Sequence, residues 1–147
     1  MAIKQVKLEN KIFDISYKII NPTLQDNIVF LHGWGANKEI MQQAFDKYFT
    51  NLKHIYLDLA GFGKSTNDYI LTTYDYAKIT NKFLHEIEIN PQNSIIVGHS
   101  FGGKVATLLN PSKLILLSSA GIIEQKSTKT LLTIKMAKIF NKFGLKK

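Results

Sequence analysis

Three short apolar runs, each followed directly by a glycine-containing loop, constrain the fold of this 147-residue chain more than any other feature. The runs lie at residues 27–31, 54–57 and 94–97 and are rich in Ile, Val, Leu and aromatic side chains. Continuous apolar runs of this length are typical of strands that are covered on both faces, as in a parallel sheet. The sequence therefore predicts a sheet with buried strands at its centre.

The segments around these runs have helical or hairpin periodicity. An opening hairpin followed by alternating strands and helices predicts an α/β fold, with a mostly parallel sheet, an N-terminal antiparallel hairpin and helices on both faces. The elements expected besides the three runs are a hairpin over 6–20 that turns near 9–11, a helix from Asn37 to about Phe49, a helix from Thr72 or Thr73 to about Ile89, a short helix from Ser100 to near Asn110, and a strand over 114–117.

Composition excludes several classes of function. All 19 basic residues are lysine, and the net charge of +8 arises mostly from lysines beyond Glu124, the last acidic residue. Without arginine or a base-stacking motif, this charge does not indicate nucleic-acid binding. The absence of cysteine excludes thiolate metal sites, and we expect neither a metal nor a cofactor. The sequence has no signal-peptide core and no apolar run of about 18 residues, which favours a cytoplasmic protein.

The loop after the third run, Gly-His-Ser-Phe-Gly at 98–102, places a serine on a sharp turn between a strand and a helix. Gly98 and Gly102 allow that strand and helix to approach closely. The free backbone N–H groups at the start of the helix can stabilise a developing negative charge. Ser100 is therefore a candidate nucleophile, with a serine that merely packs in a tight turn as the alternative.

The other two loops carry motifs of their own. His-Gly-Trp-Gly follows the first run at 32–35, and Asp-Leu-Ala-Gly-Phe-Gly-Lys-Ser follows the second at 58–65. The carboxyl ends of neighbouring parallel strands face one crevice, where ligands bind. We therefore expect the three loops to converge around Ser100.

Together the motifs H-G-x-G, D-x-x-G-x-G-x-S and G-x-S-x-G, in this order, resemble those of the α/β-hydrolases over about residues 6–121. The Leu-His-Gly-Trp-Gly form is most similar to pimeloyl-carrier-protein methyl ester esterases, and carbon–carbon bond hydrolases are also similar. The resemblance implies a serine hydrolase that acts on a small ester or acyl substrate through an acyl-enzyme on Ser100. It implies an oxyanion hole made by the backbone N–H groups of Trp34 and Phe101.

The remaining motif residues are expected to support these loops. Adjacent residues of an extended run point to opposite sides, so we expect His99 to pack beneath the neighbouring loops rather than to act as the general base. Asp58 is expected to be structural, and His32 to organise its loop through backbone hydrogen bonds. The supporting residues are His32, Gly33, Gly35, Asp58, Gly98, His99 and Gly102.

In the α/β-hydrolases an acid and a histidine follow the nucleophile in the chain. Here no histidine or aspartate follows Ser100, and Glu124 is the one acid. We therefore expect a truncated protein, with the N-terminal part of the hydrolase core at 1–121 and the start of a helical cap, a basic amphipathic helix, at 122–147. The strand at 114–117 would then be an exposed apolar edge.

Three further hypotheses follow from this. The chain could be a catalytically inactive remnant or a binding-only protein, or a second polypeptide could supply the missing half. A lysine-faced helix over 127–147 is also compatible with an anionic membrane surface. An unpartnered cap helix explains the same pattern, and we favour it.

Overall fold

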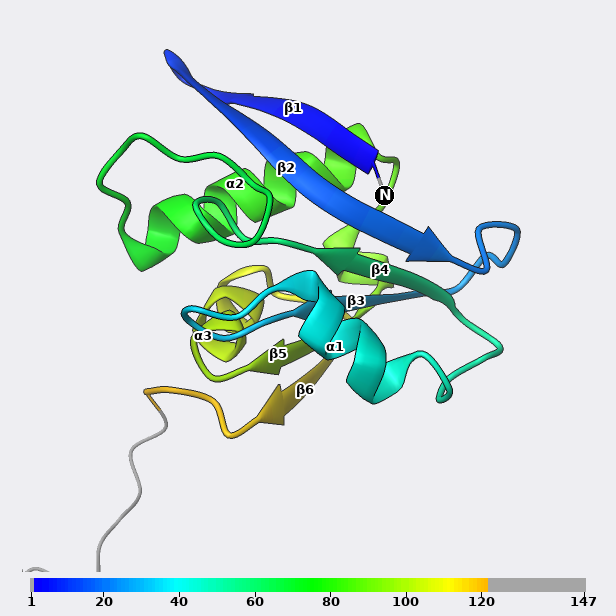
Figure 1. The fold of residues 1–147 in the computed structure, drawn as a ribbon. Helices are drawn as coiled ribbons and strands as arrows, with labels where there is room; N and C mark the ends of the chain where they lie inside the picture. The colour runs from blue at the N-terminus through cyan, green and yellow to red at the C-terminus, as the bar shows by residue number, and fades with distance from the viewer. Residues whose placement is uncertain (1, 122–147) are drawn as a thin grey trace, which may run out of the picture.

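The computed structural model describes residues 2–121, which form a six-stranded sheet in the order β1-β2-β4-β3-β5-β6 (Figure 1). The elements are β1 (Ala2–Leu8), β2 (Lys11–Ile20), β3 (Asn27–Leu31), α1 (Lys38–Phe45), β4 (Lys53–Leu57), α2 (Thr73–Glu86), a 3-10 turn (Pro91–Asn93), β5 (Ile95–His99), α3 (Phe101–Leu108) and β6 (Lys113–Leu117).

The pairing of the strands confirms the predicted class of sheet. β1 and β2 form an antiparallel hairpin, and β2 is also antiparallel to β4. β4, β3, β5 and β6 are parallel to one another. The carboxyl ends of β3, β4 and β5 therefore lie at the same end of the sheet, where the three loops that follow these strands meet.

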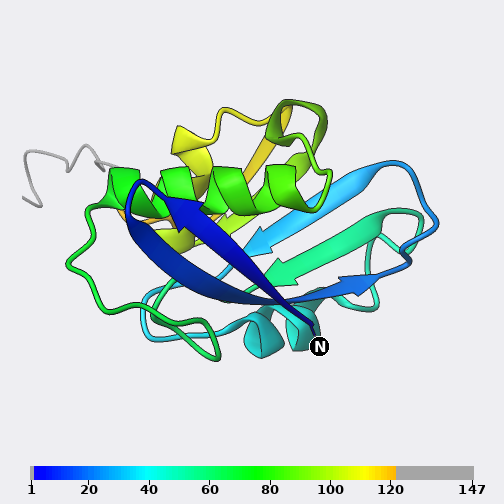
Figure 2. The same ribbon diagram turned by 90° about the horizontal axis from the view of Figure 1, so that it is seen from above.

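Side chains alternate between the two faces of the central strands, which explains why helices cover both. In β3, Ile28 and Phe30 belong to one core and Val29 and Leu31 to the other. Figure 2 shows α1 on one face and α2 and α3 on the opposite face. The α1 side is the smaller core, in which the Phe30 ring stacks on the Tyr56 ring with centroids 4.6 Å apart.

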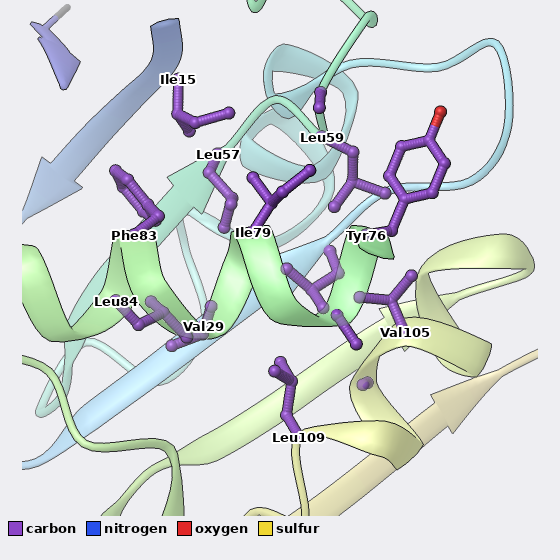
Figure 3. Packing of buried hydrophobic residues seen from close by; sticks show 14 of the residues in the cluster. Ile15, Val29, Leu57, Leu59, Tyr76, Ile79, Phe83, Leu84, Val105 and Leu109 are labelled. Atoms are coloured by element: carbon purple, nitrogen blue, oxygen red, sulfur yellow. The ribbon is translucent and has the colours of Figure 1, made fainter. Parts of the chain in front are cut away.

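The larger core lies between the sheet and the helices α2 and α3. α2 presents apolar side chains at helical spacing, among them Ile79 and Phe83, toward Ile15 and Leu57 of the sheet (Figure 3). All four are almost completely buried. Burying such a side chain contributes about 1.5–3 kcal/mol, so this layer fixes α2 against the sheet.

Both ends of α2 are set by local hydrogen bonds. Thr72 is the N-cap of a capping box: its hydroxyl oxygen accepts from the Asp75 amide, and the Asp75 carboxylate accepts from the Thr72 amide. The carboxylate also accepts from the Thr72 hydroxyl, and these bonds hold the pKa of Asp75 below its ordinary value. The helix ends at Glu86, earlier than the predicted Ile89. Glu88 has a φ of 61°, and the Ile89 amide donates to the Leu84 carbonyl at 2.8 Å, which closes the helix in a Schellman motif without glycine.

α1 begins as predicted but is shorter than predicted. The Asn37 side chain accepts a hydrogen bond from the Ile40 amide at 3.1 Å, as an N-cap does. The helix ends at Phe45 rather than near Phe49. Phe49 has a φ of 55°, and its carbonyl accepts from the Leu52 amide and bonds the His54 ring. This turn returns the chain to the sheet.

β6 forms an edge of the sheet in the described part of the chain, and its apolar side chains are exposed. Leu114, Ile115 and Leu116 are 38%, 36% and 38% exposed. A groove lined partly by Leu108 and Leu116 runs between α3 and β6. The expected exposed edge is therefore present in the described residues, whereas the expected cap helix at 122–147 lies outside them. Among the described residues, no helix is long and apolar enough to cross a bilayer.

The capping box predicts the effect of one substitution on stability. Thr72→Ala removes the acceptor for the Asp75 amide, so the free energy of unfolding should fall by about 1 kcal/mol. Urea denaturation followed by circular dichroism measures this change. The control is Thr23→Ala, an exposed threonine between β2 and β3, which should change stability by less than about 0.5 kcal/mol. Equal stability of the two variants would contradict the prediction.

Candidate active site

Ser100 occupies a strained turn between β5 and α3. Its backbone has φ 49° and ψ −114°, a conformation that costs a residue with a side chain about 1–3 kcal/mol. Ser100 is the first residue before α3, yet its side chain makes no capping hydrogen bond. Ser100 is half-buried, and its hydroxyl is therefore not used to cap the N-terminus of α3.

Close backbone contacts explain why glycine flanks this turn. A Cβ on Gly98 would lie 2.6 Å from the Gly102 oxygen, and a Cβ on Gly102 would collide with the carbonyls of Leu31 and His32. The turn is also tied to the segment after β6. The Ser100 amide donates to the Leu117 carbonyl at 3.0 Å, and its carbonyl accepts from an amide of that segment. Strand, helix and turn are thus fixed relative to one another.

The loop between β3 and α1 lies directly against the serine turn. A Cβ on Gly33 would be 3.0 Å from Nδ1 of His99 and 3.2 Å from Cβ of Ser100. The next residue, Trp34, is 68% exposed, and its ring meets the Phe101 ring edge to face at 5.2 Å. The structure therefore brings Trp34 beside Ser100 and Phe101, which lie far from it in the sequence.

Two further aromatic residues complete a cluster that the sequence motifs did not identify. Phe62, from the loop after β4, lies 4.9 Å from the Trp34 ring. Tyr76, from α2, lies 5.0 Å from the Phe101 ring and is nearly buried, which raises the pKa of its hydroxyl. The helical spacing of Tyr76 indicated only that it belongs to the apolar face of α2.

His32 joins the loop after β3 to the loop after β4. Its Nε2 accepts a hydrogen bond from the Leu59 amide at 3.0 Å, so its Nδ1 carries the proton and donates to the Gly33 carbonyl at 2.8 Å. The ring is fully buried, and this burial lowers the pKa of His32. His32 is therefore a neutral ring that links the loops after β3 and β4, and both of its nitrogens form hydrogen bonds to the backbone of these loops.

Asp58 is buried at the start of the loop after β4. Its carboxylate accepts hydrogen bonds from the Lys38 and Lys64 amides at 2.7 and 2.9 Å and pairs with the Lys38 ammonium at 2.7 Å. Burial acts to lower the pKa of Lys38, but the Asp58 and Glu39 carboxylates outweigh it, so this pKa is raised. Both carboxylate oxygens of Asp58 are therefore used to connect the loop after β4 to the start of α1. The sequence did not indicate Lys38, because a lysine in the first turn of a helix is normally exposed.

The other histidines differ in their surroundings. His99 lies beside Gly33 of the loop after β3, but it is exposed rather than packed beneath the neighbouring loops as expected. His54 lies at the start of β4, with its ring nitrogens bonded to the Tyr56 hydroxyl and the Phe49 carbonyl. His85 is exposed on α2. Within residues 2–121, no histidine is hydrogen-bonded to the Ser100 hydroxyl, and no cluster of three or more metal-binding side chains occurs.

With this geometry established, comparison with known proteins decides the family. Residues 28–141 match a family model described as the alpha/beta hydrolase family. The chain belongs to the alpha/beta hydrolase family. The matched segment includes all three of the loops that meet at the serine turn.

Among relatives, this alpha/beta hydrolase is similar to pimeloyl-[acyl-carrier protein] methyl ester esterases. It is 33% identical over 100 residues to the esterase of Pseudoalteromonas atlantica, which covers 64% of this chain and 37% of the relative. It is 34% identical over 100 residues to that of Wigglesworthia glossinidia brevipalpis, covering 64% of this chain and 36% of the relative. The matched region thus spans little more than a third of these relatives.

Solved structures agree with the fold. A thermophilic esterase from Thermogutta terrifontis superposes with a TM-score of 0.73 over 88% of this chain and 49% of its own, at 15% sequence identity. At that identity the likeness supports the arrangement of strands and helices alone. It agrees with the predicted α/β fold.

The buried, neutral His32 predicts a pH dependence of stability. Its pKa is lower in the folded than in the unfolded chain, so the unfolded state binds more protons as the pH falls below about 6.5. The contribution of His32 to stability is complete above pH 6.5 and is lost as the pH falls toward the folded-state pKa. His32→Gln should reduce the slope of unfolding free energy against pH by up to about 1.4 kcal/mol per pH unit.

Urea denaturation at pH 5.0–7.5 measures the two slopes. Slopes are compared rather than absolute stabilities, because glutamine also changes the loop contacts. His85→Gln, which replaces an exposed histidine on α2, is the matched control and should retain the wild-type slope. A His32→Gln slope equal to the wild-type slope would contradict the prediction.

Proposed function

We propose that this chain carries the nucleophile and oxyanion hole of a serine hydrolase that cleaves carboxylic esters through an acyl-enzyme. The observation that carries this proposal is the strained turn at Ser100. It places beside the Gly33–Trp34 loop a serine whose hydroxyl makes no capping hydrogen bond to α3. A turn of this kind presents a serine at the start of a helix, where free N–H groups can face a reacting carbonyl.

In the proposed mechanism the Ser100 oxygen attacks the ester carbonyl. The resulting oxyanion is held by the backbone N–H groups of Trp34 and Phe101, each of which would contribute about 10²–10³ in rate. The alcohol leaves, and water then releases the acid from the acyl-enzyme. The contact between the Trp34 and Phe101 rings supports this assignment, because it holds the two residues at fixed positions beside Ser100.

The general base is proposed to come from sequence outside these 147 residues, in the same or a second polypeptide. A serine hydroxyl is a weak nucleophile at neutral pH without a base. Both ring nitrogens of His32 and His54 are already bonded. Among the described residues, His99 makes no hydrogen bond to the Ser100 hydroxyl, and no histidine follows Ser100 within this chain. Without its base, such a site retains only the catalysis due to the oxyanion hole and substrate binding.

For the substrate class, we propose the ester of an acyl group, by analogy with the pimeloyl-[acyl-carrier protein] methyl ester esterases. The apolar surface beside Ser100 is compatible with this. Trp34 is 68% exposed there, next to half-buried Phe62 and Phe101. This surface would contact an acyl chain without requiring a charged partner.

A binding-only role is the second candidate. The observation that favours it is the absence, within the described residues, of any hydrogen bond that could activate the Ser100 hydroxyl. Under this alternative the three loops bind an ester or acid without reacting with it. The two roles differ in the reactivity of Ser100 toward an electrophile.

The test is labelling by a fluorophosphonate, which reacts with an activated serine. Because the proposed base lies outside this chain, the wild-type chain should be labelled slowly, with the oxyanion hole alone assisting, but specifically at Ser100 and up to a 1:1 ratio on prolonged incubation. Ser100→Ala should reduce labelling by more than about 10²-fold because the nucleophile is lost. Intact-mass and peptide mass spectrometry measure the extent and position. Ser118→Ala, at an exposed serine after β6, should leave labelling unchanged. Absence of labelling in the wild type would favour the binding-only role.

A further inference from the structure

The loop that carries Trp34 is anchored at both ends on two consecutive residues of the loop after β4. At one end the His32 ring accepts a hydrogen bond from the Leu59 amide. At the other end Lys38 contacts the Asp58 carboxylate twice, through its amide and its ammonium, each at 2.7 Å. The segment between these anchors contains only residues 33–37, so its position depends on both of them.

The second anchor is an ion pair enclosed by protein. The Lys38 side chain is 3% exposed and the Asp58 side chain 0% exposed. The Lys38 ammonium also reaches the Glu39 carboxylate at 2.9 Å, and this carboxylate is 47% exposed. A Cβ on Gly63 would collide with the Asp58 carboxylate, so the loop after β4 closes over the pair on that side.

Stability alone does not account for a lysine at this position. Transferring an ammonium and a carboxylate out of water costs several kcal/mol each, and apolar residues of similar volume are often as stable or more stable. The α1 N-terminus already has its cap in Asn37, and the Asp58 carboxylate already accepts the Lys38 amide. What the ammonium adds is a directional link from the first turn of α1 to the loop after β4.

We propose that the Lys38–Asp58 ion pair is a positioning device that fixes the 33–37 loop and so sets the Trp34 N–H at the oxyanion hole. The proposal rests on the proposed function for its catalytic consequence, but the effect on the loop does not. The pair acts through the loop: among the described residues, the hydrogen bonds and ion pairs of Lys38 go to Asp58 and Glu39 and not to Ser100.

Two variants test this proposal. Lys38→Met keeps a long unbranched side chain and removes the ammonium. The double variant Lys38→Met/Asp58→Asn removes both charges, so that no carboxylate remains buried without a partner. Lys47→Met, at an exposed lysine just after α1, is the matched control. Far-UV circular dichroism and thermal unfolding establish which variants fold.

Trp34 is the one tryptophan of the chain, so its spectrum reports directly on this loop. In both Lys38 variants we expect the near-UV tryptophan band to weaken and acrylamide quenching to increase. The rate of fluorophosphonate labelling at Ser100 should fall at least about tenfold, since a misplacement of 1 Å can cost about 10²-fold. Lys47→Met should match the wild type in all three measurements.

A folded Lys38 variant with the wild-type tryptophan band, quenching and labelling rate would overturn the proposal. Failure of the double variant to fold would also overturn it, because the pair would then be needed for the fold rather than for placing the loop. If the wild type itself is not labelled, the proposed function fails. The tryptophan signals then still decide whether the ion pair positions the loop.

Discussion

The contact between the backbones of β5, α3 and β3 is the constraint on which the rest of the structure depends. Gly98 and Gly102 let these elements approach so closely that any side chain at either position would collide with main-chain atoms. This approach places the start of α3 beside the loop after β3 and forces Ser100 into its left-handed turn. The strain at the serine is therefore maintained by packing across three elements, as expected where a local conformation is over-determined by its surroundings.

Most of the fold could be predicted from the sequence because its signals are periodic. Continuous apolar runs indicated the buried parallel strands, and capping residues such as Thr72 indicated where helices begin. The ends of the helices were less predictable. Phe49 and Glu88 adopt positive φ values that side chains of their type rarely adopt. At Phe49 the carbonyl bonds the ring of His54, which lies in β4, and no propensity pattern in the sequence indicates this hydrogen bond.

The site was predictable only in part, for a related reason. The motifs identified the residues whose backbone geometry is constrained, such as Gly33 and Ser100. They did not identify Lys38 or Tyr76, whose roles arise from burial against segments distant in the sequence. The alternation argument for His99 specified a side of the strand, but it could not specify whether other residues cover that side. Burial is a tertiary property, and here it leaves His99 exposed.

The exposed edge of the sheet has a consequence for the serine turn. Two hydrogen bonds connect the serine turn to the end of β6 and the segment after it: Ser100 donates to the Leu117 carbonyl and accepts from the Ala120 amide. An unpaired apolar edge strand readily pairs with another polypeptide, including in aggregation. Such pairing would change the position and mobility of β6, and the same hydrogen bonds would transmit that change to Ser100. The position of Ser100, the proposed nucleophile, would thus depend on the state of this edge.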